Sequence, residues 1–393
     1  MSTNLDNINV YHIDSTPYGG SSTKMSKEED RSGEIWQVPT IYVLQSRRSV
    51  DYEFHQSNMD RNIYMINQQL NAKNRAANLD QFNARIFKML ENKREFDKLL
   101  YKVLEQNMEW TIDQNDSGTY YIKIKQNGYY HSSEGLGDGV WSVFTICDAL
   151  YDSKPGDIIV IDEPELSLHP ATQKKIMSLF EEYACDRQII ISTHSPYFID
   201  FEAIQNGAYL YRTHKNVNGD IFLYTMSDKS RKCISSFLKD FHQPHIFGLE
   251  AKEIFFLEDK IILTEGQEDV ILYQKAADEL KFHLKGFFFG WGSGGASNII
   301  KIALILKELG YNKIFAIFDG DKRSEEENFQ KNFENYKSVC ISKDDIRDKE
   351  GKNGTRRKEG LMRHDGTLKE ESKEEMRKIF EEINLYMEDG CTQ

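Results

Sequence analysis

The stretch IIVIDEPELSLHP (158–170), together with RQIIISTHSPYFID from Arg187 onward, decides the fold of the first half of the chain. Each stretch contains a short run of β-branched apolar residues that ends in polar residues, and a helix is predicted between them at about 171–184. Apolar runs that alternate with helices are typical of parallel strands buried on both faces. We therefore predict an α/β fold with a parallel sheet, and another buried strand within 38–48.

Polar side chains follow these two strands directly. Asp162 and Glu163 end the first strand and His194 ends the second, at the carboxyl edge where α/β sheets bind ligands. A first carboxylate there can hold Mg²⁺ through water, a second can orient and deprotonate an attacking water, and an imidazole can touch a γ-phosphate. Upstream, Ser133 and the backbone of SSEGLGDG (132–139) precede a predicted helix and are placed to face an anion. The pattern indicates half of an ATP-hydrolysing site; the alternative is a set of ordinary surface polar residues.

The glycine-rich phosphate loop that such a site requires is not recognisable. The nearest candidate is PYGGSSTK (17–24), in which Lys24 follows Thr23 instead of preceding it. We interpret this segment as a plain loop. Two explanations stay open: the chain begins downstream of the phosphate loop, or its nucleotide site is incomplete. ATP is therefore an expected ligand only in combination with groups outside this sequence.

Carboxylates also follow two apolar runs in the second half of the chain. KIILTEG (260–266) ends with Glu265, with Asp269 four residues later, and KIFAIFDGDK (313–322) ends with Asp319 and Asp321. Residues at i and i+2 of an extended chain share a face, so the last two side chains open toward the same space. Four carboxylates without nearby His or Cys are typical of a hard site for Mg²⁺ or Mn²⁺. The alternative is that Asp-Gly-Asp is a plain turn and that Glu265 is an acid at a helix N-terminus, stabilised there by the helix dipole.

A locally basic segment follows within a chain of formal net charge −13. Between Lys343 and Arg363 there are eight Lys or Arg against five Asp or Glu. Such residues can contact a nucleic-acid backbone beside the predicted metal site, and we add Asp345 and Lys358 to that site. The alternative is a solvated loop, because glycine and charge also mark flexible segments.

Both sets of motifs resemble known domain families. The segments at 132–139, 158–170 and 187–200 are similar in order and spacing to the signature motif, Walker B motif, D-loop and H-switch of ABC-type ATPases of the SMC, RecF and Rad50-like branch. That resemblance implies that Ser133 and Gly135 contact the γ-phosphate of a partner subunit in a head-to-tail ATP dimer. The second half resembles the Toprim domain, in which Glu265, Asp269 and the DxD pair bind metal. GWGSGGASNI (290–299) stands where that family has a glycine-rich turn, which makes Ser293 a candidate ligand.

An ABC-type ATPase followed by a Toprim domain resembles the OLD (overcoming lysogenization defect) nucleases. The resemblance implies a metal-dependent DNA endonuclease or nickase that assembles into a homo-oligomer through its ATPase domain, often in bacterial anti-phage defence. It also implies a helicase-like partner, or a retron reverse transcriptase with its RNA–DNA hybrid. In this reading Glu163 and Lys358 join the four carboxylates as catalytic residues. Arg347 departs from the family, which often has an acid there.

Other classes fit less well. A topoisomerase would need further domains with a tyrosine nucleophile, and a primase usually brings a zinc ribbon with cysteine pairs. The five cysteines are far apart, which instead favours a reducing cytoplasm. No apolar run of about 18 residues exists, so no membrane span is expected. A nucleotide-sensing scaffold that binds nucleic acid without cutting it remains the alternative.

The expected organisation has four parts. Residues 1–34 form an irregular lead-in, and 35–228 form a mixed or parallel ATPase sheet with a helical insertion and no Walker A motif. Residues 229–258 form a linker, and 259–393 form a Rossmann-like α/β Toprim domain. Within the ATPase part, helical spacing from about Met59 to Met108 precedes small antiparallel strands at 110–132, which alternate Tyr or Ile with Lys.

Overall fold

The computed structural model of the chain separates into two compact units, Met1–His194 and Ser195–Gln393. The residues that it describes are 14–15, 21–22, 39–46, 53–54, 63 and 82–388, without 127, 133–135, 217, 240–243, 258 and 351–356. The lead-in 1–34 and the segment 17–24 fall outside these ranges, apart from the short strands β1 (Asp14–Ser15) and β2 (Ser21–Ser22). None of the helices in the described ranges has the length and apolar character needed to cross a membrane.

The first unit is built on a parallel sheet with strand order β3-β8-β9. Its strands are β3 (Ile41–Leu44), β8 (Ile158–Asp162) and β9 (Gln188–Ser192), and α5 (Pro170–Tyr183) connects the last two. Pairing is in parallel register, with Ile161 opposite Leu44 on one side and Ile191 on the other. The predicted parallel strands and the helix between them are confirmed, but their expected burial on both faces is not, because alternate residues of β3 and β9 are exposed.

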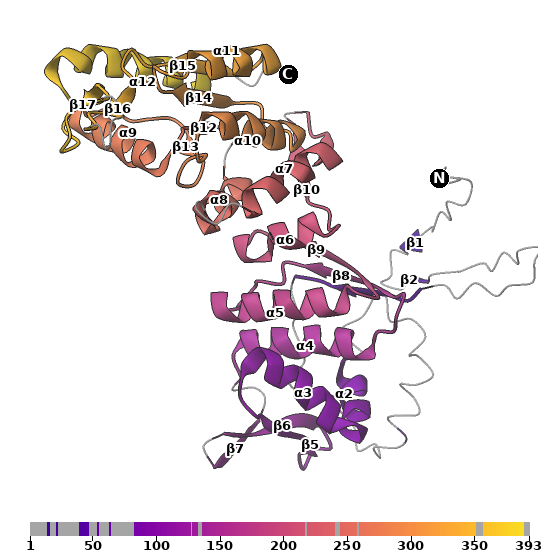
Figure 1. The fold of residues 1–393 in the computed structure, drawn as a ribbon. Helices are drawn as coiled ribbons and strands as arrows, with labels where there is room; N and C mark the ends of the chain where they lie inside the picture. The colour runs from indigo at the N-terminus through magenta and orange to yellow at the C-terminus, as the bar shows by residue number, and fades with distance from the viewer. Residues whose placement is uncertain are drawn as a thin grey trace, which may run out of the picture. The chain divides into compact units, whose positions relative to one another are not determined.

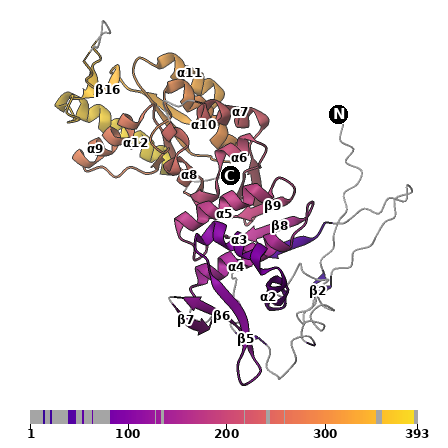
Figure 2. The ribbon, with the colours of Figure 1, turned by 60° about the horizontal axis from the view of Figure 1, so that its bottom comes forward.

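A buried helical layer and a small antiparallel sheet complete this unit. The helices are α2 (Phe82–Glu91), α3 (Lys93–Leu104) and α4 (Asp138–Asp152), and the strands are β4 (Glu53–Phe54), β5 (Glu109–Gln114), β6 (Tyr120–Gln126) and β7 (Tyr129–Ser132). Residues 141–150 of α4 are all buried, because α3 and α4 lie between the parallel and the antiparallel strands (Figure 1, Figure 2). The Trp110 indole donates to Asp97 at 2.8 Å and joins β5 to α3. The antiparallel strands predicted at 110–132 are confirmed.

The second unit contains a four-stranded parallel sheet in the order β13-β12-β14-β15. Its strands are β12 (Ile261–Leu263), β13 (Phe287–Phe288), β14 (Ile314–Phe318) and β15 (Lys337–Cys340). Its helices are α9 (Gln267–Glu279), α10 (Ala296–Glu308), α11 (Arg323–Asn332) and α12 (Lys373–Glu388).

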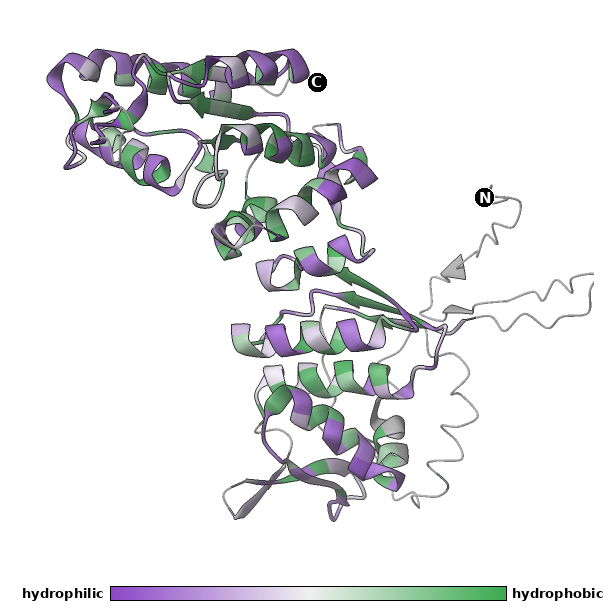
Figure 3. Ribbon diagram, viewed as in Figure 1, coloured by the Kyte–Doolittle hydropathy of each residue, from purple (hydrophilic) through white to green (hydrophobic). Residues whose placement is uncertain are grey.

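Both faces of this sheet are covered. Ile261 and Leu263 belong to one hydrophobic cluster, which also contains side chains of α10 and α11, whereas Ile262 belongs to a second cluster with α9 and α12. Successive side chains of a strand point to opposite faces, so the two central strands have apolar residues at every position. They accordingly appear hydrophobic along their length in Figure 3.

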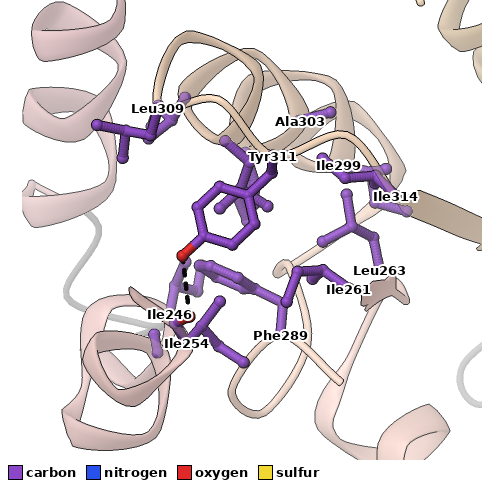
Figure 4. Packing of buried hydrophobic residues seen from close by; sticks show 14 of the residues in the cluster. Ile246, Ile254, Ile261, Leu263, Phe289, Ile299, Ala303, Leu309, Tyr311 and Ile314 are labelled. Carbon is purple, nitrogen blue, oxygen red and sulfur yellow. Dashed lines mark hydrogen bonds between the residues drawn. The ribbon is translucent and has the colours of Figure 1, made fainter. Parts of the chain in front are cut away.

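Apolar side chains from the described residues between 195 and 257 pack into the first of these clusters. They form η3 (Pro196–Phe198), α6 (Phe201–Gln205), the hairpin β10 (Tyr211–Lys215) and β11 (Ile221–Thr225), α7 (Asp228–Leu238), η4 (Pro244–Phe247), α8 (Leu249–Glu253) and η5 (Ile254–Phe256). Ile234, Ile246 and Ile254 are buried with Leu263 and Ile299. The expected linker at 229–258 therefore contains helices whose apolar side chains share the core of the second unit; Figure 4 shows the hydrogen bond that Tyr311 makes there.

Two short strands close the second unit. They are β16 (Asp345–Arg347) and β17 (Gly360–Met362), which pair in parallel register, and a 3-10 turn, η6 (Glu370–Ser372), precedes α12. Beyond β16, Lys349 and Lys358 form an isolated antiparallel bridge. A Cβ on Gly360 would lie 2.1 Å from the carbonyl carbon of Arg347, so only glycine permits this close approach of the two segments.

Candidate functional site

The predicted carboxylates of the second half meet at the carboxyl ends of β12 and β14. These strands are parallel neighbours in which Leu263 pairs with Ala316, so Glu265 and Asp319 leave the sheet side by side. The Asp319 backbone N–H donates to Glu265 Oε1 at 3.0 Å. Gly320 is required at the turn, because a Cβ there would lie 2.3 Å from the Lys343 carbonyl oxygen. The structure thus brings together the two strand ends that the sequence singled out.

Asp269 lies at the third position of α9 and caps that helix. Its Oδ2 accepts from the Gly266 backbone N–H at 2.8 Å, and its side chain is buried. The alternative interpretation assigned the role of helix N-terminal acid to Glu265, but in the structure Asp269 caps the helix. Only one of its two oxygens accepts this hydrogen bond, so the other oxygen can still bind a ligand.

Asp321 and Asp345 differ from the first three acids because they form ion pairs. Lys358 Nζ lies 2.9 Å from Asp321 Oδ2 and 3.7 Å from Asp345 Oδ2, and Lys322 Nζ lies 3.5 Å from Asp321. Asp345 is 3% exposed and also contacts Lys349 Nζ at 2.7 Å. Lys358 thus connects the DxD turn with β16, and the three predicted residues form one cluster.

The backbone of the glycine-rich turn, which includes Ser293, is hydrogen-bonded to the residues that follow β12. The Ser293 N–H donates to the Thr264 carbonyl at 3.0 Å and the Gly295 N–H donates to the Glu265 carbonyl at 2.8 Å. A Cβ on Gly292 would lie 2.5 Å from the carbonyl carbon of Gly266, so the turn can approach only without a side chain. Within the described part of the chain the buried Ser293 Oγ has no hydrogen-bond partner. An orphaned hydroxyl of this kind fits a polar ligand.

The local electrostatics separate the acids into two groups. Burial, followed by the neighbouring carboxylates Asp269 and Glu265, raises the pKa of Asp319 to about 8. Burial is also the main reason that the pKa of Asp269 rises to about 7 and that the pKa of Glu265 is raised. Burial alone would raise the pKa of Asp321, but the hydrogen bond and the charge of Lys358 outweigh burial, so the pKa of Asp321 is lowered.

These properties suit a divalent cation. Three close carboxylates that repel one another, and an unpartnered hydroxyl beside them, present only oxygen donors. A bound cation would relieve the repulsion that raises their pKa values. Across the described ranges, no three Asp, Glu, His or Cys side chains are already arranged to hold one ion, so binding requires some of these side chains to turn.

Three charged residues beside this cluster were not among the predicted site residues. Glu268 forms ion pairs with Arg347 and, at 3.1 Å, with Lys349. The Arg347 guanidinium also donates to the His364 carbonyl at 3.2 Å. In the sequence, the only sign of these contacts was that Arg347 stands where the family often has an acid. That sign did not indicate that Glu268 would be its partner.

The predicted nucleotide residues meet in the first unit. Asp162 ends β8 and accepts from Ser192 Oγ of β9, and the Glu163 N–H donates to the Ser192 carbonyl at 2.8 Å. Glu163 adopts a positive φ of 44°, an unfavourable conformation that recurs at functional sites. His194 Nε2 lies 3.9 Å from Glu163 Oε1, and its side chain is 82% exposed. Ser133 and Gly135 lie outside the described residues.

Glu165 was missed as a member of this group. Its two carboxylate oxygens accept from Thr193 Oγ1 at 2.7 Å and from the His194 N–H at 2.6 Å. It therefore holds the chain that follows β9 against the chain that follows β8. The sequence shows that Glu165 is the last residue of DEPE. It does not show that this side chain contacts the loop after β9.

Comparison with protein families divides the chain in the same order. Residues 51–200 match the family model described as "AAA domain, putative AbiEii toxin, Type IV TA system". Residues 256–321 match the model described as "Overcoming lysogenization defect protein-like, TOPRIM domain".

Individual relatives match parts of the chain. It is 30% identical over 122 residues to the Old nuclease of Escherichia phage P2, covering 30% of this chain and 20% of the relative. It is 26% identical over 182 residues to the endonuclease GajA of Bacillus cereus (strain VD045), covering 43% of this chain and 28% of the relative. The chain thus spans less than a third of either relative. The SMC head domain from Thermotoga maritima aligns with a TM-score of 0.27 at 17% identity, over 38% of this chain and 52% of that one, which is too weak to support an argument.

The two family matches confirm the expected fold class, an ATPase α/β domain followed by a TOPRIM α/β domain. The chain thus combines a match to an AAA domain family with a match to an overcoming-lysogenization-defect (OLD)-like TOPRIM domain, and over part of its length it is similar to two nucleases.

Proposed function

We propose that the chain is a divalent-metal-dependent DNA endonuclease or nickase whose chemistry takes place at the Glu265–Asp319 cluster. The observation that carries this proposal is the hydrogen bond from the Asp319 backbone to Glu265, which holds two partly buried acidic residues side by side at adjacent strand ends. The TOPRIM match and the nuclease relatives support the same conclusion.

Each residue has a separate task in this proposal. Glu265, Asp269 and Asp319 would hold Mg²⁺ or Mn²⁺, with Asp321, Asp345 and Ser293 beside them. When bound, the ion supplies activation of a water and stabilisation of the leaving oxygen. Lys358, already within 2.9 Å of Asp321, would contact the phosphate and orient it. The basic residues from Lys343 to Arg363 would hold the DNA backbone nearby.

The first unit would control assembly instead of cutting DNA. Asp162 and Glu163, with His194 beside them, form the part of a nucleotide site that holds Mg²⁺ and activates water. We propose that this unit forms a homo-oligomer through ATP, with Ser133 and Gly135 of one subunit facing its partner. We further propose that the chain acts in the cytoplasm in anti-phage defence, with a helicase-like or reverse-transcriptase partner. The family resemblance supports this proposal.

A plasmid-nicking assay tests the nuclease function. Purified chain with Mg²⁺ or Mn²⁺ should convert supercoiled DNA to nicked or linear product, and Asp319→Asn/Asp321→Asn should abolish the product. Asp278→Asn is the matched control, because Asp278 is an exposed acid of α9 outside the cluster. The nuclease proposal fails if the wild-type chain leaves DNA intact, or if the double variant cuts as well as the wild type. DNA binding without cutting would instead support the scaffold alternative.

A further inference from the structure

The carboxylates around β12, β14 and β16 differ in whether the protein itself balances their charge. The first group consists of Glu265, Asp269 and Asp319. In the described ranges none of them has a lysine or arginine within ion-pair distance, and Lys322, Lys349 and Lys358 lower their pKa values less than burial raises them. Each member of the second group forms at least one such pair; this group consists of Glu268, Asp321 and Asp345. One cluster therefore contains an uncompensated half and a compensated half.

Lys349 is the centre of the compensated half. Its ammonium lies 2.7 Å from Asp345 Oδ2 and 3.1 Å from Glu268 Oε2, so it bridges two acids. Arg347 contacts the same Glu268 and is anchored by the His364 carbonyl. Two positive side chains thus face two negative ones, and the charge of this half is balanced. Asp345 is almost fully buried, and a buried carboxylate without a partner is costly.

The backbone places Lys349 at this position. Lys349 and Lys358 face each other across an antiparallel bridge, with N–H to carbonyl distances of 3.1 Å and 3.0 Å. Directly opposite residues of such a pair have side chains on the same face, and like charges there destabilise the pair. The arrangement is tolerated because Asp321, Asp345 and Glu268 lie against the two ammonium groups. Both lysines are therefore directed to the acids by main-chain hydrogen bonds, not only by flexible side chains.

We propose that Lys349 is a resident cation of this cluster, so that an ammonium group occupies the Glu268–Asp345 half and the cluster binds one divalent ion instead of two. Sites with two ions place them about 4 Å apart and share carboxylates between them. A second divalent ion between Glu268 and Asp345 would lie beside the positive side chains of Lys349 and Arg347, whose repulsion opposes its binding. The uncompensated half, by contrast, has three acids, and in the described ranges none of them forms an ion pair with a lysine or arginine, although Lys358 and Lys349 act on them from farther away.

The inference rests on the proposed metal binding but not on DNA cleavage. Nucleotide-free full-length chain is titrated with Mn²⁺, and the electron paramagnetic resonance signal of free Mn²⁺ gives the number of ions bound. We expect one ion per wild-type chain, lost in Asp319→Asn. We expect Lys349→Gln to bind a second ion, and Lys349→Gln/Asp345→Asn to return to one. Lys343→Gln is the matched control, because Lys343 pairs at 2.7 Å with the exposed Glu359 and should leave the count at one.

Several outcomes overturn the proposal. One is that the wild-type chain binds two ions and that Asp345→Asn removes one of them, and another is that the wild-type chain binds no ion. A third is that Lys349→Gln has a native circular dichroism spectrum but still binds only one ion. Cleavage measured on the same samples separates this inference from the proposed function. A chain that binds two ions and cuts DNA refutes only the resident cation, whereas a chain that binds one ion and never cuts refutes only the nuclease.

Discussion

Replacing Tyr311 by Phe tests whether residues 229–258 belong to the core of the second unit. The Tyr311 hydroxyl donates to the Ile254 carbonyl at 3.0 Å, and its ring is buried among residues of α10, β12 and β14 (Figure 4). Phe keeps the ring and its contact with the Arg212 guanidinium, which lies 4.0 Å from the ring centre. The substitution therefore removes one hydrogen bond between the expected linker and the sheet, and little else.

The magnitude follows from what remains at Ile254. Its carbonyl also accepts from the Leu257 N–H at 3.2 Å, so the loss of Tyr311 does not leave it without a donor. The cost should then be that of one net hydrogen bond, about 1 kcal/mol, and not the higher cost of an orphaned group. A loss of about 1 kcal/mol corresponds to a roughly fivefold increase in the population of the open form.

Hydrogen–deuterium exchange of the full chain measures this directly. In the limit where closing is fast, amides of α10 and β14 that exchange through opening of the unit should exchange about fivefold faster in Tyr311→Phe. Tyr211→Phe is the control, because Tyr211 is 52% exposed on β10, and it should leave these amides unchanged. Equal rates in wild type and Tyr311→Phe, or an equal acceleration in Tyr211→Phe, would refute the packing of this segment onto the core.

Two further predictions concern neighbouring parts of the same unit. Burial alone would raise the pKa of Glu308, but the hydrogen bonds that it accepts from the Ser227 hydroxyl and backbone N–H outweigh burial, so its pKa is lowered. Ionised Glu308 therefore contributes its full stabilisation to the folded state at pH values above the usual glutamate pKa. This contribution is lost as the pH falls through the lowered pKa of Glu308. The Tm advantage of wild type over Glu308→Gln should shrink from pH 7 toward pH 3; a constant difference contradicts this. Gly292→Ala should lower Tm more than Gly207→Ala, because both have positive φ but only Gly292 would also clash, at 2.5 Å, with Gly266. A smaller loss at Gly292 would contradict the tight approach of the turn.

The parallel strands and the positions of the acids at their ends could be predicted from the sequence. Ile158–Asp162 and Ile314–Phe318 are apolar at nearly every position, and this pattern is visible without a structure. The burial on both faces that it predicts holds for β14, whereas alternate residues of β3 and β9 beside β8 are exposed. The polar residue that follows such a strand lies at the ligand-binding edge, which places Asp162 and Asp319.

The packing of 229–258 and the ion pairs could not be predicted. The helical turns there are three to five residues long outside α7, too short to show a period of 3.6. Arg347 and Glu268 are 79 residues apart, and a basic side chain in a charged segment has many possible partners. Their pairing depends on β16 lying beside α9, which is a property of the tertiary fold.

The hydrogen bond between Asp319 and Glu265 also has a consequence for how the chain acquires its chemistry. The two residues are 54 positions apart, and their contact exists only after β14 has paired with β12. Pairing of distant parallel strands comes at the cost of closing a long loop and is slow compared with helix formation. During synthesis, Glu265 and Asp269 leave the ribosome well before Asp319, so the nascent chain has only half of the carboxylate cluster. A chain that cuts DNA would thus remain harmless until its fold is nearly complete.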